Sequence, residues 1–224
     1  MKTTLAALAL LLAAPAFAQD EVVSTAPQKT VTIVEATTIQ ADDHIYGDAD
    51  APSELVVYAS VTCGHCGKWF TEQWPEVKAR ADAGDLRVAL REVPTTPAQV
   101  SVAGFMLANC AGEEAYFTNI ERQFQEQQTT IEALQAGEGQ ARFVEMSEAA
   151  GLGGEDAIQA CLSDDTHYAP IERSITRFEA AGGNGVPMFF LDGKEVGDAH
   201  DASDILALLD ATDVDTTDAD SGDE

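Results

Sequence analysis

The spacing of apolar residues divides the chain into segments with the period of a strand and segments with the period of a helix. Residues 55–59 form an uninterrupted apolar run, which indicates a central strand buried on both faces. From Phe70 to Ala81 the apolar residues recur at helical spacing, and residues 86–90 alternate as a second strand does. A short alternating stretch at 31–34 predicts a further strand ahead of this strand–helix–strand unit.

A long helical block separates this unit from the C-terminal part of the chain. Its apolar stripes predict five helices, at 102–110, 117–124, 143–150, 157–162 and 168–178. The last of these helices is expected to end at Gly182-Gly183, because paired glycines stop a helix.

The period returns to two after the helical block. Residues 186–191 predict a strand entered through a proline, and Asp192-Gly193 is a strong hairpin signal before a partner strand at 194–196. A final helix is expected at 205–209 from the spacing of its apolar residues. The element order is βαβ, helical block, ββα. We therefore predict an α/β fold with a mixed central sheet and a helical domain inserted between its two halves.

The two ends of the chain lack these periods. Residues 1–18 combine Lys2, an apolar run and Ala16-Phe17-Ala18, which together are typical of a cleavable secretory signal. The apolar run is too short to cross a hydrocarbon core of about 30 Å, so a membrane anchor is the weaker alternative. The last residues are acidic and small, which predicts a solvated tail. The predicted division is a signal peptide (1–18), an N-terminal extension (19–41), a first half (42–96), a helical insertion (97–183), a second half (184–210) and an acidic disordered tail (211–224).

Composition and charge restrict the partners of the protein. The chain has 224 residues and is 45% hydrophobic, which is enough for a sizeable core in one or two domains. Its 12 basic and 39 acidic residues give a net charge of −27, which repels a phosphate backbone and an anionic lipid surface. We therefore expect no nucleic-acid partner. The same charge opposes self-association, so we expect a monomer.

The sharpest chemical feature is Cys63-Gly64-His65-Cys66, where the central strand ends and a helix begins. Two cysteines three residues apart on one helical face bring their sulfurs close enough to bond. The N–H groups at the start of the helix stabilise a thiolate at Cys63, and His65 lowers the pKa of Cys63 further. A stabilised thiolate is a good leaving group. We therefore expect Cys63 to be the nucleophile, Cys66 to be a deeper resolving thiol, and their disulfide to oxidise substrate thiols.

Alternative interpretations of the cysteines stay open from the sequence. The pair could be half of a zinc site, although His44, His167 and His200 show no suitable spacing, or it could be a strained structural disulfide. Cys110 and Cys161 both fall on apolar stripes of the helical block. They can form a stabilising disulfide that closes a loop of about fifty residues, stay two buried thiols, or act as an accessory redox pair.

Two further groups of residues are expected to be structural. Trp69, Phe70 and Trp74 are more typical of a core and groove wall than of a cofactor site. The acidic stretch Asp198–Asp204, which contains His200, is expected to be a solvated helix start rather than a metal site. We therefore expect no metal and no bound cofactor, since a redox-active disulfide carries the chemistry.

The order of the elements, the Cys63-Gly64-His65-Cys66 motif and the Gly185-Val186-Pro187 entry to a late strand resemble the DsbA-like thiol:disulfide oxidoreductases of the thioredoxin superfamily. The resemblance covers about residues 42–210. It implies a thioredoxin fold, catalytic roles for both cysteines of the motif, and tuning of the first by the histidine between them. It also implies that Pro187 is cis and that Val186 beside it forms part of a substrate-contacting loop.

The chain departs from this family at two places near the motif. Gly64 stands where many DsbA proteins have proline, and Gly64-His65 is the dipeptide of the eukaryotic disulfide isomerases. Val57 and Ser60 stand where family members often carry a carboxylate near the buried thiol, so no proton acceptor for Cys66 is identifiable from the sequence.

The leading hypothesis is an exported thiol:disulfide oxidoreductase of the periplasm that introduces disulfides into secreted proteins. Its expected partners are reduced, unfolded secreted proteins and a membrane thiol oxidase that restores the disulfide. A disulfide isomerase or reductase of the same fold is the alternative. A more distant alternative is a binding protein that uses its thiols to hold a metal or a partner.

Overall fold

The computed structural model describes residues 30–196 and 205–211. The predicted signal peptide (1–18), the acidic stretch Asp198–Asp204 and residues 212–224 of the predicted tail lie outside these ranges. The described residues from Val31 onward belong to one unit of the chain.

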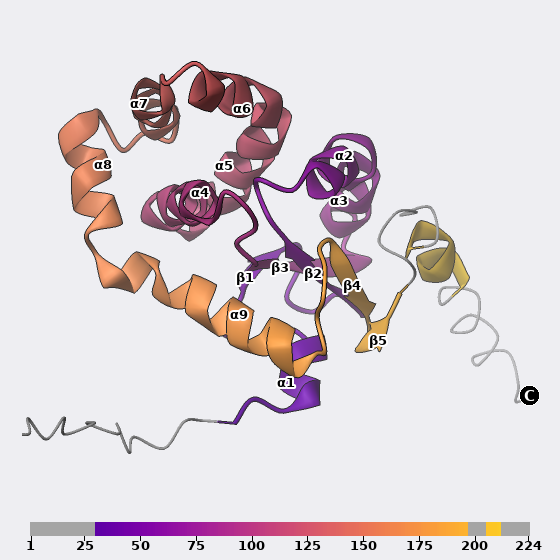
Figure 1. Cartoon of the computed structure of the whole chain (residues 1–224). Helices are drawn as coiled ribbons and strands as arrows, with labels where there is room; N and C mark the ends of the chain where they lie inside the picture. The colour runs from indigo at the N-terminus through magenta and orange to yellow at the C-terminus, as the bar shows by residue number, and fades with distance from the viewer. Residues whose placement is uncertain (1–29, 197–204, 212–224) are drawn as a thin grey trace, which may run out of the picture. The chain divides into compact units, whose positions relative to one another are not determined.

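One mixed sheet of five strands, in the order β1-β3-β2-β4-β5, forms the centre of this unit (Figure 1). Its strands are β1 (His44–Tyr46), β2 (Ser53–Ala59), β3 (Leu86–Glu92), β4 (Met188–Leu191) and β5 (Lys194–Glu195). β2 runs parallel to β3 and antiparallel to β4, so Val57 lies between Leu90 and Phe189. The apolar run at 55–59 is therefore the central strand, as predicted.

The helices confirm the predicted α/β fold with a helical insertion between its halves (Figure 1). α2 (Gly64–Glu72) and α3 (Trp74–Asp82) connect β2 to β3. The insertion between β3 and β4 consists of α4 (Ala98–Cys110), α5 (Glu113–Gln125), α6 (Gln127–Gln135), α7 (Gly139–Ala149), α8 (Glu155–Leu162), a 3-10 turn (Asp165–His167) and α9 (Ala169–Ala180). Residues 205–211 are helical, which agrees with the final predicted helix.

The helix after the cysteine motif is divided, whereas its spacing predicted one helix from Phe70 to Ala81. The division falls at Gln73, between α2 and α3. Pro75 occupies one of the first positions of α3 and has no N–H group, so it cannot continue the hydrogen bonds of α2. The apolar side chains keep their spacing across the break, and both helices cover the same side of the sheet.

The strand predicted at 31–34 is wrong, because this segment forms α1 (Ile33–Thr37). A capping box begins the helix: the Thr32 hydroxyl accepts from the Glu35 N–H, and the Glu35 carboxylate accepts from the Thr32 N–H. Ile33 and Val34 are 59% and 62% exposed. The apolar positions at 31–34 therefore do not mark the buried face of a strand.

The packing divides the side chains of β2 between two cores. Leu55, Val57 and Ala59 belong to the larger core, which contains residues of α2, α3, α4 and α5 and also Cys66. Val56 and Tyr58 point to the opposite face of the sheet and pack with residues such as Phe178 of α9. The buried end of the cysteine motif, Cys66, therefore lies in the larger core.

Cys110 and Cys161 form a disulfide that joins α4 to α8. Their Cα atoms lie 6.0 Å apart, and 51 positions separate them in the sequence. A cross-link over a loop of this length removes chain entropy from the unfolded state and stabilises the fold by about 4 kcal/mol. The sequence had left this pairing open among three possibilities.

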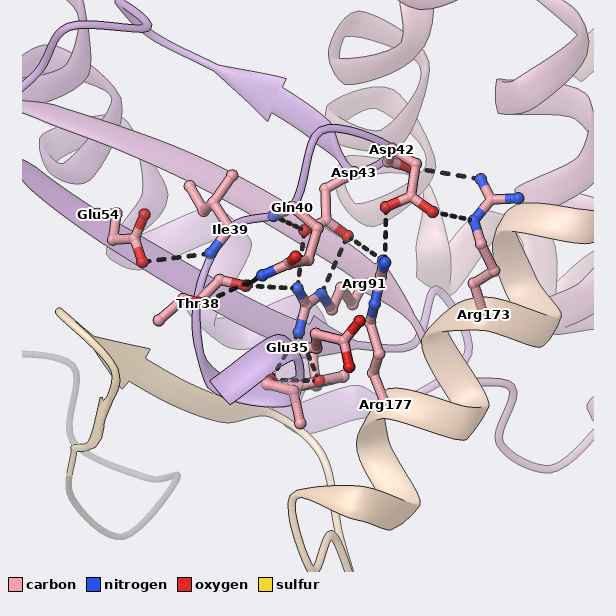
Figure 2. A network of polar contacts seen from close by, with 12 residues as sticks. Glu35, Thr38, Ile39, Gln40, Asp42, Asp43, Glu54, Arg91, Arg173 and Arg177 are labelled. Carbon is pink, nitrogen blue, oxygen red and sulfur yellow. Dashed lines mark hydrogen bonds and ion pairs between the residues drawn. The ribbon is translucent and has the colours of Figure 1, made fainter. Parts of the chain in front are cut away.

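A network of buried ion pairs connects the segment after α1 to β3 and α9 (Figure 2). Arg91 is fully buried, and its five N–H groups donate to Asp43, Tyr58 and the carbonyl oxygens of Ala36 and Thr38. Arg177 donates to Asp43 at 2.8 Å and to Asp42 at 2.6 Å. Because each charge has an opposite partner, the network fixes the chain in front of β1 without leaving an unpaired buried charge.

Candidate active site

Cys63 lies at the point where the loop after β2 meets the first turn of α2. It is the N-cap residue, with extended backbone angles, and its carbonyl oxygen accepts from the Gly67 N–H at 2.9 Å. Cys63 is partly buried, whereas Cys66, one turn further along α2, is completely buried. Both residues are free thiols. The structure therefore has the predicted pair of an accessible and an inaccessible sulfur at the start of a helix.

The two thiols differ strongly in acidity. The pKa of Cys63 is lowered to about 5, first because the Cys66 thiol donates a hydrogen bond to it and then because the backbone N–H groups of Cys66 and His65 do so. Partial burial opposes this effect, and the charge of His65 adds to it. Burial raises the pKa of Cys66 far above its usual range, and the neighbouring Cys63 raises it further. At neutral pH Cys63 is therefore a thiolate and Cys66 a thiol.

The loop that enters β4 lies directly beside Cys63. The Val186–Pro187 peptide bond is cis, which is the isomer that the resemblance implied. The carbonyl oxygen of Val186 lies 3.4 Å from the sulfur of Cys63 and accepts a hydrogen bond from it when Cys63 is protonated. The structure thus brings Cys63, Cys66 and the Val186–Pro187 loop together from segments more than a hundred residues apart.

A second cis bond, Thr96–Pro97, lies in the loop between β3 and α4 and was not foreseen from the sequence. Together with Val61 and Thr62, these residues form one wall of a cavity of about 270 Å³ between the motif loop and the helical insertion. The remaining walls are mainly apolar side chains of α4, α6 and α7, among them Val100, Ile131, Leu134, Phe143 and Met146. An apolar hollow therefore lies beside the segment that leads into Cys63.

Helix α6 forms one side of this cavity and was also not predicted. No residue of α6 is buried, so its apolar side chains give no clear helical stripe. Gln127, at its start, connects the helix to the motif, because its amide donates to the carbonyl oxygens of Val61 at 2.8 Å and Cys63 at 3.0 Å. Ile131 and Leu134 remain partly exposed at the cavity.

Glu92, at the end of β3, is a buried carboxyl that sequence analysis did not single out. It is completely buried and accepts from the Tyr116 hydroxyl at 3.0 Å and the Asn109 amide at 3.3 Å. Burial raises the pKa of Glu92 to about 7, although both hydrogen bonds act in the opposite direction. The predicted strand ended at residue 90, and nothing in the local sequence shows that the charged residue at position 92 is buried.

The aromatic residues near the motif are core, as expected. Trp69, Phe70 and Trp74 are buried, and Phe70 stacks on Phe124 of α5. Among residues 30–196 and 205–211 no group of three or more His, Cys, Asp or Glu side chains is placed to hold a metal. No helix in that part of the chain is both long and apolar enough to cross a membrane.

Comparisons with known proteins agree with this architecture. A family model described as "Thioredoxin" matches residues 40–211. The chain is 27% identical over 186 residues to the putative protein-disulfide oxidoreductase RC0029 of Rickettsia conorii, with 80% of this chain and 65% of that protein covered. It is 26% identical over 170 residues to the Na(+)/H(+) antiporter NhaA of Herminiimonas arsenicoxydans, with 76% of this chain and 25% of that protein covered.

A solved structure gives the same picture of the fold. Alpha-DsbA1 of Wolbachia pipientis is similar with a TM-score of 0.69 and 21% sequence identity, over 80% of this chain and 95% of that chain. The helical insertion between the halves of the sheet is thus an arrangement that this chain shares with a DsbA-type structure. The chain spans about a quarter and about two thirds of the two curated relatives, so their activities as whole proteins do not transfer directly.

Proposed function

We propose that this chain, which belongs to the thioredoxin family, is a thiol:disulfide oxidoreductase that oxidises the thiols of other proteins with a Cys63–Cys66 disulfide. The observation that carries the proposal is the low pKa of Cys63, about 5, beside a buried thiol one helical turn away. A stable thiolate at Cys63 favours the reduced enzyme. The disulfide is therefore readily given up, and the enzyme is an oxidant of its substrates.

The exchange proceeds in two steps that balance in electrons, and the Cys66 thiolate that the first step releases takes up the proton that a substrate thiol loses. A substrate thiolate attacks the Cys63 sulfur of the oxidised enzyme, the Cys63–Cys66 bond breaks, and its electron pair stays on Cys66. A second substrate thiolate then attacks the substrate sulfur of the mixed disulfide and expels Cys63 as a thiolate. The substrate gains one disulfide, and the enzyme is left with two reduced cysteines.

The surroundings of Cys63 support a polypeptide as the substrate. The cis-proline loop presents the Val186 carbonyl oxygen next to the reacting sulfur, where a backbone N–H of an extended peptide can pair with it. The apolar cavity beside Thr62 offers space for a hydrophobic side chain of a chain that has not yet buried its core. Reduced, unfolded secreted proteins offer both an extended backbone and exposed hydrophobic side chains.

The place of action is part of the proposal. Residues 1–18 have the features of a cleavable secretory signal, and a disulfide donor is useful in the oxidising periplasm. In that compartment the reduced enzyme needs a thiol oxidase, which we place in the membrane, to remove its two electrons. The high net negative charge, −27, supports a monomer in solution.

The test is to measure the reduction potential and the oxidation of a reduced, unfolded protein. We expect a potential between about −180 and −120 mV, the range of strong disulfide donors. Cys63→Ser should abolish transfer, and Cys66→Ser should accumulate mixed disulfides at Cys63. A potential near about −270 mV, typical of cytosolic reductants, together with no oxidation of the substrate, would contradict the proposal.

A disulfide isomerase or reductase is the second candidate. It is favoured by Gly64-His65, because the same dipeptide stands between the two cysteines of the eukaryotic disulfide isomerases. An isomerase must keep Cys63 reduced, whereas an oxidase must keep it in a disulfide. Trapping the thiols in living cells with acid and an alkylating agent separates the two. Mostly alkylated Cys63 would favour the isomerase, and mostly protected Cys63 the oxidase.

A further inference from the structure

The buried sulfur of Cys66 has an unusual polar contact. The backbone N–H of Ser60 donates to it at 3.4 Å. Ser60 follows directly after β2 and is itself completely buried. Burial disfavours a negative charge on Cys66, whereas this N–H favours it. The N–H is therefore placed to act on the thiolate that Cys66 becomes whenever the disulfide opens.

The side chain of Ser60 is the centre of a cluster of four hydroxyl groups. Its oxygen lies 2.8 Å from the hydroxyl of Ser101, 2.9 Å from that of Thr95 and 3.2 Å from that of Thr62. It also accepts from the Thr95 N–H at 3.2 Å. Thr62 and Thr95 are linked to each other at 2.9 Å. The cluster thus ties the end of β2, the motif loop, the loop before Pro97 and α4 to one point.

Such a cluster has consequences for the Ser60 backbone. Ser60 and Ser101 are fully buried, and a buried hydroxyl that loses its partners is costly, so the arrangement resists movement. With its side chain fixed by three other hydroxyls, the peptide unit of Ser60 is held in one orientation. That orientation aims its N–H at the sulfur of Cys66.

We propose that Ser60 is a positioning residue of the exchange reaction, whose hydroxyl cluster holds the Ser60 backbone N–H on Cys66 so that it stabilises the Cys66 thiolate. This inference rests on the proposed function. When a substrate thiolate attacks Cys63, the Cys63–Cys66 bond breaks, its electron pair moves to Cys66, and the N–H is already in place. In the reverse step the Cys66 thiolate attacks Cys63 and expels the substrate thiolate. A donor fixed in a water-excluded site before the charge develops lowers the barrier in both directions.

The experiment follows the reverse step in isolation. The reduced enzyme is converted to a mixed disulfide of Cys63 with glutathione, and the release of glutathione by Cys66 is measured between about pH 5 and pH 10. In Ser60→Ala the release should be about tenfold slower at neutral pH, because a misplaced donor loses much of its effect. The curve of release rate against pH should also shift by about one unit toward higher pH, because fewer Cys66 groups are ionised at a given pH.

Two variants separate positioning from a general loss of stability. Ser60→Thr keeps a hydroxyl at the centre of the cluster and should restore most of the rate. Ser147→Ala removes another fully buried serine hydroxyl, in α7, that lies outside the cluster, and should leave rate and pH profile unchanged. Should Ser60→Ala not fold, Ser101→Ala carries the same test, since it removes the partner at 2.8 Å.

The outcomes distinguish this inference from the proposed function. A folded Ser60→Ala enzyme with the parental pH profile, or an equal change in Ser147→Ala, overturns the positioning role. An unmodified enzyme that releases glutathione in the expected way but does not oxidise an unfolded protein overturns only the direction of the proposed function. An unmodified enzyme that exchanges with no thiol at all overturns both.

Discussion

Glu92→Gln is the change for which the structure gives the most definite energy. The carboxyl of Glu92 is completely buried, and burial raises its pKa from the ordinary 4.5 to about 7. Below pH 4.5 the group is protonated in both the folded and the unfolded protein and has no effect on the pH dependence of stability. Between pH 4.5 and pH 7 the Glu92 carboxyl is ionised in the unfolded chain but keeps its proton in the folded protein. The free energy of unfolding therefore falls as the pH rises through that window, and the loss is complete above about pH 7.

The size of this effect follows from the two pKa values. Each pH unit between them costs about 1.4 kcal/mol, so Glu92 lowers the free energy of unfolding by about 3 kcal/mol between pH 4 and pH 8. Glutamine has nearly the same shape, can still accept from Tyr116 through its one amide oxygen, and carries no proton that titrates. The stability of Glu92→Gln relative to the parent should therefore rise by about 3 kcal/mol over the same range.

The assay is urea unfolding followed by circular dichroism at intervals between pH 4 and pH 8. Both proteins are used in the oxidised form, so that Cys63 and Cys66 do not titrate. Glu76→Gln, on the exposed face of α3, is the matched control and should follow the parent at every pH. A constant difference between Glu92→Gln and the parent across the whole range would show that Glu92 does not hold a proton in the folded protein.

Three further changes test other parts of the structure. Arg91→Met leaves Asp43 buried with one of its two arginine partners. It should lower the free energy of unfolding, measured by urea titration, by about 3 kcal/mol, and adding Asp43→Asn should restore part of the loss. The alkylation rate of reduced Cys63 by iodoacetamide should rise with a midpoint near pH 5, and Cys66→Ala should move that midpoint upward because the first hydrogen bond to the thiolate is lost. Ile131→Ser should raise KM for an unfolded protein substrate and leave exchange with glutathione unchanged, since only a polypeptide has a side chain to place in the cavity.

The cysteine motif could be predicted from the sequence because its determinants are local. The apolar run at 55–59, the two cysteines and the helix that follows are consecutive, so their order alone places Cys63 at a helix start. The same is true of the hairpin at Asp192-Gly193, whose turn residues stand between its strands. The role of Val186 in a substrate-contacting loop came instead from the resemblance to a known family, and its contact with Cys63 came from the structure, because no local pattern brings these residues together.

The hydroxyl cluster around Ser60 could not be predicted in this way. Its members are separated by as many as 41 positions, and serine and threonine are common on any surface. What distinguishes them is burial at the meeting point of a strand end, two loops and α4, which depends on the complete fold. Glu92, at the end of β3, was missed for the same reason, since its partners Tyr116 and Asn109 lie in two helices that follow later in the chain.

The errors at the helices have a different physical cause. A hydrophobic stripe is visible only when one face of a helix is buried, and α6 buries none of its residues. In α1 the apolar residues Ile33 and Val34 are exposed, so their spacing carries no information about packing. The Thr-x-x-Glu pattern of Thr32 and Glu35 is a capping-box signal, and it is the feature that indicates a helix there.

The sheet separates the buried ion-pair network from the redox site. Arg91, Asp43 and Arg177 pair around Tyr58, which packs on one face of the sheet, whereas Cys66 belongs to the core on the other face. A protein with a net charge of −27 would disfavour a thiolate if its carboxylates lay beside the sulfur. The contacts that lower the pKa of Cys63 are instead mostly short-range, from a thiol and two backbone N–H groups. Hydrogen bonds of this kind act only over a few ångströms, so the acidity of Cys63 is governed by its immediate contacts and can be maintained in a strongly acidic protein.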